Sequence, residues 1–154
     1  MTYFELALCQ KIGNVFSLAV SKYKLNRTDF INEFLKSNVF FNICDGDCTL
    51  ISQGKYYILN KFLDESPLPE TNISDFDENA MFWLGYVMMY WCLTDTITGS
   101  YIVSNYDLEK IYQFYDILHS LKVSAAINDI KENFSLSSNS PLEKTHNAKK
   151  DIFL

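Results

Sequence analysis

Four cysteines and two histidines are the first side chains of this sequence to consider as metal ligands, nucleophiles or bases. Cys44 and Cys48 lie in the segment CDGDC, and the three-residue gap between these thiols could serve a zinc ion. A structural zinc site requires four ligands, and a catalytic one requires three with a water. The other candidate ligands form no second pair at such a spacing: Cys9, Cys92, His119 and His146. We therefore predict no metal and no cofactor, and we interpret the cysteines as small, weakly polar residues around a turn.

His119 is the candidate for acid–base chemistry. It follows an apolar stripe in DILHSL and could act as a general base. A partly buried histidine bonded to a nearby backbone group is the commoner arrangement, and it is the interpretation that we favour. The sequence contains no Walker loop, no Gly-x-Gly-x-x-Gly, no Gly-x-Ser-x-Gly and no His-Glu-x-x-His. We therefore predict that the protein is not an enzyme, with an enzyme that uses His119 as an alternative.

The charge balance argues against nucleic acid as a partner. The chain has 154 residues and a net charge of −6, and its 13 basic residues are scattered among 19 acidic ones rather than clustered. Proteins that bind nucleic acids usually present a basic face to the phosphates. Residues 16–37 nevertheless resemble a helix–turn–helix, so a DNA-binding or transcriptional adaptor is the alternative function. Asp29 and Glu33 on its second helix would face phosphates unfavourably.

The N-terminal segment and the apolar runs predict a cytoplasmic protein without a membrane partner. The first residues include Glu5 and show neither a basic region nor a small-residue cleavage site. The longest apolar run, 81–93, has 13 residues, whereas about 20 are needed to cross a bilayer. In a reducing cytosol, disulfides between the four cysteines are not expected.

Apolar residues at three- and four-residue intervals predict helices along the first half of the chain. We expect them over 3–23, 28–37 and 54–63. Between the second and third of these, short apolar runs flank Asp-Gly-Asp. This pattern predicts a turn between extended segments, a short hairpin around 39–51.

The second half opens with the segment FWLGYVMMYWCL, which is apolar on nearly every side of a helix. Such a helix is buried on most sides, so we expect its aromatic residues at the centre of a helical core: Trp83, Tyr86, Tyr90 and Trp91. The predicted helices of this half cover 77–94, 98–104, 107–118 and 122–133.

These elements predict a mainly α fold, a small helical bundle with a flexible C-terminal tail. An acidic stretch with two prolines separates two helical units, so the expected organisation is an N-terminal unit, a linker, a C-terminal unit and a tail: 1–64, 65–76, 77–134 and 135–154. The endings CTLISQGKYYILNKFL and YDILHSLKVSAAINDI look related, which suggests two similar helical halves. Chance similarity between apolar helices is the alternative. The corresponding positions are Ile51 and Leu118, Leu59 and Ile127, and Phe62 and Ile130.

The second half resembles a family of small bacterial and phage helical proteins of unknown function. Their pattern is Trp-x-Gly-Tyr, then Tyr-Trp, a later Tyr and His, and finally Ala-Ile. The positions of this chain that match it are Trp83, Gly85, Tyr86, Tyr90, Trp91, Tyr115, His119, Ala126 and Ile127. The chain departs from the pattern at two positions: Met89 replaces an Arg of the family, and Leu118 replaces the Tyr that precedes the His. The first half is similar to a companion family of short helical proteins, at Gln53, Gly54, Tyr57 and Ile58.

Genes of such proteins often lie beside toxin genes, including genes of toxins similar to ADP-ribosyltransferases. The resemblance therefore implies an antitoxin-like protein that neutralises a toxin by direct protein–protein binding. The acidic chain would complement a basic partner, and the apolar C-terminal end could anchor in a pocket of that partner. Self-association is left open. The predicted partner-binding residues are Tyr86, Tyr90, Tyr115, His119, Ile152, Phe153 and Leu154.

Overall fold

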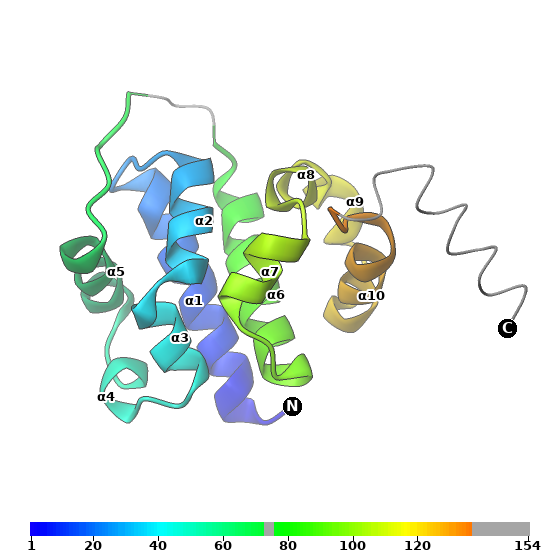
Figure 1. Ribbon diagram of the computed structural model, residues 1–154, viewed down its shortest axis with the longest axis horizontal. Coiled ribbons are helices and arrows are strands. Elements are labelled where there is room, and N and C mark those ends of the chain that lie inside the picture. Colours follow the sequence, from blue (N-terminus) through cyan, green and yellow to red (C-terminus); the bar gives the residue numbers. More distant parts are fainter. Residues whose placement is uncertain (73–75, 137–154) are drawn as a thin grey trace, which may run out of the picture.

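The protein is a small bundle of helices (Figure 1), as its sequence predicts. The computed structural model describes residues 1–72 and 76–136, and within these residues it contains ten helices and no named strand. The predicted partner-binding residues Ile152, Phe153 and Leu154, and nearly all of the predicted tail, lie outside the described residues. The helices are α1 (Tyr3–Ser21), α2 (Arg27–Lys36), α3 (Asn38–Cys44), α4 (Cys48–Ile51), α5 (Lys55–Glu65), α6 (Glu78–Asp95), α7 (Gly99–Asn105), α8 (Leu108–Gln113), α9 (Tyr115–Leu118) and α10 (Val123–Asn133).

The two longest helices, α1 and α6, pack against each other more extensively than any other pair. They run in opposite directions, so Ser17 near the end of α1 donates a hydrogen bond to Glu78 at the start of α6. Two glycines allow the close approach. A Cβ atom at Gly13 would lie 2.8 Å from the carbonyl oxygen of Phe82, and one at Gly85 would lie 2.7 Å from the Phe16 ring. The helix backbones are therefore almost in contact.

The termini of α6 are fixed by local hydrogen bonds and backbone geometry. Asp77 is the N-cap, and its carboxylate accepts from the backbone N–H groups of Asn79 at 2.9 Å and Ala80 at 3.1 Å. Thr96 ends the helix in the left-handed conformation, at φ 53°. Half of the 18 residues between these caps are buried, which explains why the segment is apolar around most of its circumference.

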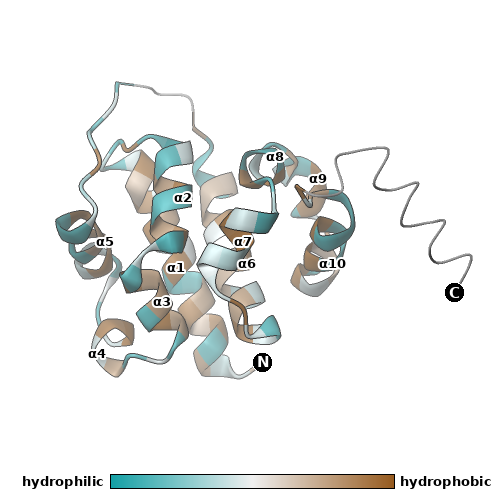
Figure 2. Ribbon diagram, viewed as in Figure 1, coloured by the Kyte–Doolittle hydropathy of each residue, from teal (hydrophilic) through white to brown (hydrophobic). Residues whose placement is uncertain are grey.

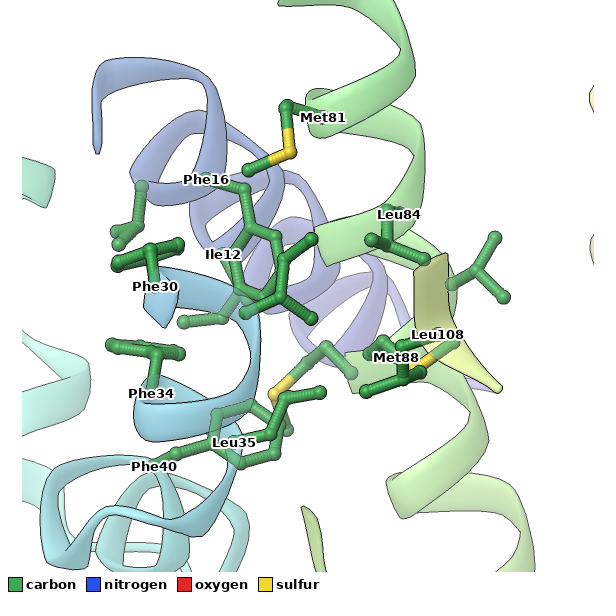
Figure 3. Close-up of a cluster of buried hydrophobic side chains, with 14 of the residues drawn as sticks. Ile12, Phe16, Phe30, Phe34, Leu35, Phe40, Met81, Leu84, Met88 and Leu108 are labelled. Atoms are coloured by element: carbon green, nitrogen blue, oxygen red, sulfur yellow. The ribbon is translucent and has the colours of Figure 1, made fainter. Parts of the chain in front are cut away.

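A cluster of phenylalanines joins α1 to α2, α3 and α5. Figure 3 shows its members from α1, α2 and α3: Phe16, Phe30, Phe34 and Phe40. The ring of Phe16 meets those of Phe30 and Phe34 edge-on, at centroid distances of 5.1 and 5.6 Å. Phe34 also contacts Phe62 of α5, at 5.3 Å, and Phe40 of α3, at 5.5 Å. These distances and angles are typical of favourable aromatic pairs. Figure 2 shows the complementary pattern, with mostly hydrophilic residues on the side of α2 that faces the viewer.

The predicted hairpin around 39–51 is wrong, because α3 and α4 occupy this segment. Ser37 starts α3 by accepting a hydrogen bond from the backbone N–H of Phe40, at 3.1 Å. Asp47 starts α4 in the same way, by accepting from Thr49 N at 2.9 Å. Gly46 lies between the two helices and has a positive φ of +88°. Glycine adopts this backbone conformation without steric cost. The segment Asp-Gly-Asp is therefore a turn between two short helices rather than between strands.

The helix predicted over 107–118 is two helices. Phe114 separates α8 from α9 with φ −91° and ψ 15°, outside the helical range. Helices are present at all the other expected positions, with ends that differ by at most two residues: 3–23, 28–37, 54–63, 77–94, 98–104 and 122–133.

The order of helix lengths repeats between the two halves of the chain. Each half has one long helix, three shorter ones and a final helix of 11 residues, and α4 and α9 have four residues each. The predicted equivalents Ile51 and Leu118 are the last residues of α4 and α9. Both halves contribute to the same hydrophobic cluster. This is the arrangement that a duplicated helical unit would give.

The acidic connector is attached to the turn that follows α1. Leu25 and Glu70 form an isolated antiparallel bridge. Thr71 donates two hydrogen bonds to the carbonyl oxygen of Lys24, from its backbone N–H at 2.8 Å and from its hydroxyl at 3.1 Å. The part of the connector before residue 73 is thus held against the first half of the chain.

Candidate functional site

Aromatic side chains of α6 and of the turn at α9 are linked by ring contacts, and we call this group the aromatic face. Its residues are Phe82, Trp83, Tyr86, Tyr90, Tyr115 and His119. It contains the four described members of the predicted partner-binding set, and the remaining three lie outside the described residues. The contact between the two helices is made by Trp83 and Tyr115, whose ring centroids are 5.7 Å apart. The structure thus brings together residues that are more than 30 positions apart in the sequence.

The spacing of the α6 residues explains why they share a face. Phe82, Tyr86 and Tyr90 follow each other at four-residue intervals, which places them on adjacent turns of one side of a helix. The rings of Phe82 and Tyr86 are 6.3 Å apart. Trp83 lies next to this row and reaches across to α9. The row borders α1, because Gly13 leaves room for the Phe82 side chain.

The turn at α9 fixes the other part of the aromatic face. Tyr115 and His119 are four residues apart, and their rings stack with centroids 4.3 Å apart and planes inclined by 21°. The Nδ1 atom of His119 lies 2.7 Å from the carbonyl oxygen of Tyr115. His119 is therefore bonded to the backbone, as expected, but it is exposed rather than partly buried. Within residues 1–72 and 76–136, no acidic or nucleophilic group forms a hydrogen bond with its ring.

The aromatic face is half-buried rather than hidden. Trp91 is 1% exposed, which confirms its place in the core. The prediction that Trp83, Tyr86 and Tyr90 also lie at the centre of the core is wrong, since all three keep part of their surface accessible to solvent. Each of them packs against the core with one side. They can therefore offer the other side to a partner without losing their anchorage.

Burial and nearby carboxylates perturb the tyrosines of the aromatic face. Burial is the main cause that raises the pKa of Tyr115, and the negative charges of Asp77 and Asp116 add to it. Burial also raises the pKa of Tyr86, together with the neighbouring Cys9 and Tyr90. The phenol groups of both tyrosines are therefore neutral at physiological pH. They are available as hydrogen-bond donors at an otherwise apolar surface.

Acidic groups border the aromatic face at the start of α6 and at α9. Asp77 caps α6, Glu78 accepts the hydrogen bond of Ser17 at 3.3 Å, and Asp116 is exposed. Among the described residues, the ion pairs engage other acids: Glu109 with Arg27, Glu33 with Lys36, and Asp95 with Lys131. The carboxylates at this border therefore leave a negative potential beside the aromatic rings.

A second polar cluster links α2 to α8. The guanidinium of Arg27 forms an ion pair with Glu109 and stacks on the ring of Tyr112, with 4.1 Å between its central carbon and the ring centroid. Thr28 donates a hydrogen bond to the other oxygen of Glu109, at 3.2 Å. These contacts hold Arg27 within the fold. The first basic side chain of the second helix in the predicted helix–turn–helix, Arg27, is therefore engaged in contacts within the fold.

Sequence patterns missed two members of the aromatic face. Phe82 was not predicted to contact a partner, although the four-residue interval to Tyr86 and Tyr90 gives the signal that could have found it. Trp83 was placed in the core. Its half-exposed position depends on where α9 lies, and no local pattern specifies this position.

Comparisons of the chain with protein families, with curated proteins and with solved structures find no match. Among the described residues, no helix combines the length and the apolar content required to cross a bilayer. In the same part of the chain, no three His, Cys, Asp or Glu side chains are grouped in a way that could hold a metal ion.

Proposed function

We propose that this protein binds another protein through the aromatic face and that it acts as an antitoxin-like neutraliser of that partner. The resemblance to proteins encoded beside toxin genes supports the biological role. The observation that carries the binding role is the aromatic face itself, in which residues of α6 and α9 remain half-exposed while anchored in the core. A toxin similar to an ADP-ribosyltransferase is the partner class that the resemblance implies.

Anchored aromatic residues are well suited to binding a protein. Tyr and Trp are enriched among the residues that dominate interface energies, because they present a large apolar area with few rotatable bonds. Trp83, Tyr86 and Tyr115 are already held by packing within the fold. Little further side-chain freedom is lost when a partner covers them. Their hydroxyl and indole N–H groups can form directional hydrogen bonds at the rim.

The charge around the aromatic face favours a basic partner. The chain carries a net charge of −6, and Asp77, Glu78 and Asp116 border the rings. A lysine or arginine side chain placed over a tyrosine or tryptophan ring is attracted by its π-electrons, with about 0.5–2 kcal/mol for each contact. Opposite charges on the two surfaces would also accelerate association.

A binding measurement with the toxin-like product of a neighbouring gene tests this proposal. We expect Tyr86→Ala to weaken the affinity by roughly 10-fold or more, because truncation of a central aromatic residue commonly costs above 1.4 kcal/mol. Tyr3→Ala is the matched control, since Tyr3 is a tyrosine that is 90% exposed and outside the aromatic face. Thermal unfolding of both variants checks that each retains its fold. Equal affinities of the Tyr86 variant and the wild type would contradict the assigned surface.

The role of the border carboxylates is tested by charge reversal. We expect Asp116→Lys to slow association with the basic partner, and Asp64→Lys to have a smaller effect, because Asp64 is an exposed acid on α5. Salt should reduce the difference between the two variants. The biological role requires a separate assay, in which co-expression of the wild type restores the growth of cells that produce the toxin. Tight binding without restored growth would contradict the antitoxin role alone.

A further inference from the structure

Three of the four cysteines, from three different helices, lie close together in the fold. Cys9 belongs to α1, Cys44 to α3 and Cys92 to α6. The charge of Cys44 is among the causes that raise the pKa of both Cys9 and Cys92, so the three thiols are neighbours in the fold. The fourth cysteine, Cys48, is exposed, and its sulfur lies 3.7 Å from the carbonyl oxygen of Gly46. Cys9, Cys44 and Cys92 are thus neighbours in space but far apart in the sequence.

Cys44 and Cys92 also face a common cavity. This cavity, of about 130 Å³, lies between the end of α3 and the end of α6, and both cysteines contribute to its wall. Phe41 and Thr96 line it as well. Cys44 is half-buried and Cys92 is only 4% exposed. A volume of this size holds a few water-sized molecules, so a small polar oxidant can reach the sulfur of Cys44.

The surroundings keep two of the three thiols protonated. The interaction with Cys44 is the largest cause that raises the pKa of Cys92, and burial adds to it. Burial, with a smaller contribution from the charge of Glu5, raises the pKa of Cys9 to about 12. The thiolate is the reactive form of cysteine. Cys9 and Cys92 are therefore poor first nucleophiles, and the more accessible Cys44 is the thiol on which oxidation begins.

We propose that Cys44 and Cys92 are a site of reversible oxidation at which a hydroperoxide converts the two thiols into an intramolecular disulfide. The sulfur of Cys44 attacks one oxygen of hydrogen peroxide, the O–O bond breaks, and one water leaves as Cys44 becomes a sulfenic acid. The sulfur of Cys92 then attacks the sulfenic sulfur, and its S–H proton leaves with the hydroxyl group as a second water. Two thiols lose two electrons and two protons in total, and the peroxide gains them.

The disulfide would join α3 to α6 across the cavity. Its two cysteines are 48 positions apart, so the bond closes a long loop and restricts the unfolded chain strongly. Both cysteines line the same cavity, so the bond would form across it. This inference is independent of the proposed binding function, since the cavity and the aromatic face are formed by different residues.

Peptide mapping of the full-length protein after treatment with hydrogen peroxide tests the inference. Proteolysis under non-reducing conditions, followed by mass spectrometry, should recover one linked pair of peptides that contains Cys44 and Cys92, and dithiothreitol should remove it. Oxidation should also raise the melting temperature by roughly 5 °C or more.

Three variants complete the test. Cys48→Ser leaves the pair intact and should form the same disulfide, whereas Cys44→Ser should not. Cys92→Ala removes the second thiol of the pair without placing a hydroxyl group at this buried position. A link between Cys44 and Cys48, a link between two chains, or peroxide-treated wild type that retains both thiols would overturn the inference. An oxidised wild type that melts below the reduced protein would also overturn it.

Discussion

Gly85 of α6 lies directly against the backbone of Ile12 in α1, so that a Cβ atom at position 85 would be 2.8 Å from the Ile12 carbonyl oxygen. The same Cβ atom would lie 2.7 Å from the ring of Phe16. Neither neighbour can move easily, because both Ile12 and Phe16 are fully buried. The absence of a side chain at Gly85 therefore allows the close approach of the two longest helices here, as it does at Gly13 beside Phe82.

Gly85→Ala should lower the free energy of unfolding by about 2–3 kcal/mol, because the added methyl group forces the two helices apart. Urea denaturation measures the change. Gly54→Ala is the matched control, since a Cβ atom at Gly54 meets no atom within 4 Å, and it should change the free energy by less than about 1 kcal/mol. Equal effects of the two substitutions would contradict the close helix contact.

Thr96→Gly should make the protein more stable by about 1 kcal/mol. Thr96 ends α6 in the left-handed conformation at φ 53°, which is unfavourable for a β-branched residue and readily adopted by glycine. Thr98→Ala should act in the opposite direction by a similar amount, because it removes the hydroxyl group that accepts a hydrogen bond from Tyr101 N. Thermal unfolding of the two variants gives the signs, and a loss of stability in Thr96→Gly would refute the first.

Arg27→Ala should lower the free energy of unfolding by about 1–3 kcal/mol, since it removes both the ion pair with Glu109 and the stacking on Tyr112. Lys36→Ala is the control, because its ion pair with Glu33 is exposed at both ends. Pairs of that kind contribute less than about 1 kcal/mol. Denaturant titrations of both variants measure the two changes in the free energy of unfolding. A smaller effect at Arg27 than at Lys36 would show that the cluster does not hold α2 to α8.

Asp95 should make stability depend on pH in the acidic range. The hydrogen bond from Lys131, at 2.6 Å, is the largest cause that lowers the pKa of Asp95, and the indole N–H of Trp91 adds a second bond at 2.9 Å. Because the pKa is lower in the folded state, this contribution is fully present above the ordinary value of 3.8. It is lost as the pH falls below that value through the folded pKa.

The comparison of the wild type with Asp95→Asn measures this contribution. The difference in the free energy of unfolding should be constant near neutral pH and should shrink as the pH falls below 3.8. Lys131→Met should remove much of the same pH-dependent part, because it takes away the main partner of the carboxylate. A difference that stays constant down to pH 2 would mean that Asp95 contributes nothing through its charge.

The helices that sequence patterns predict best are those with an unambiguous start signal and sustained periodicity. Asp77 precedes an 18-residue apolar helix, and the predicted range of 77–94 differs from α6 by one residue at each end. The failure at 39–51 arose because its β-branched and aromatic residues also suit strands. Val39, Phe40 and Ile43 are nevertheless buried at helical spacing. Ser37 gave a start signal that would have favoured a helix.

The aromatic face could be predicted only in part, because it is formed by residues distant in the sequence. The four-residue intervals along α6 place Phe82, Tyr86 and Tyr90 together, and the interval within α9 places Tyr115 beside His119. The contact of Trp83 with Tyr115 depends on the interruption of the helix at Phe114, which separates α8 from α9. Without that break, one continuous helix over 107–118 would direct these rings differently.

The mutual packing of α1 and α6 makes the two halves of the chain behave as partners in a complex. Each long helix covers apolar surface that the other would expose to water, so neither half should fold when it is produced alone. Cleavage of the acidic connector after residue 72 would then leave two fragments that recognise each other. Fragment complementation, in which separately expressed halves recover the helical signal only after mixing, is the behaviour that this arrangement implies.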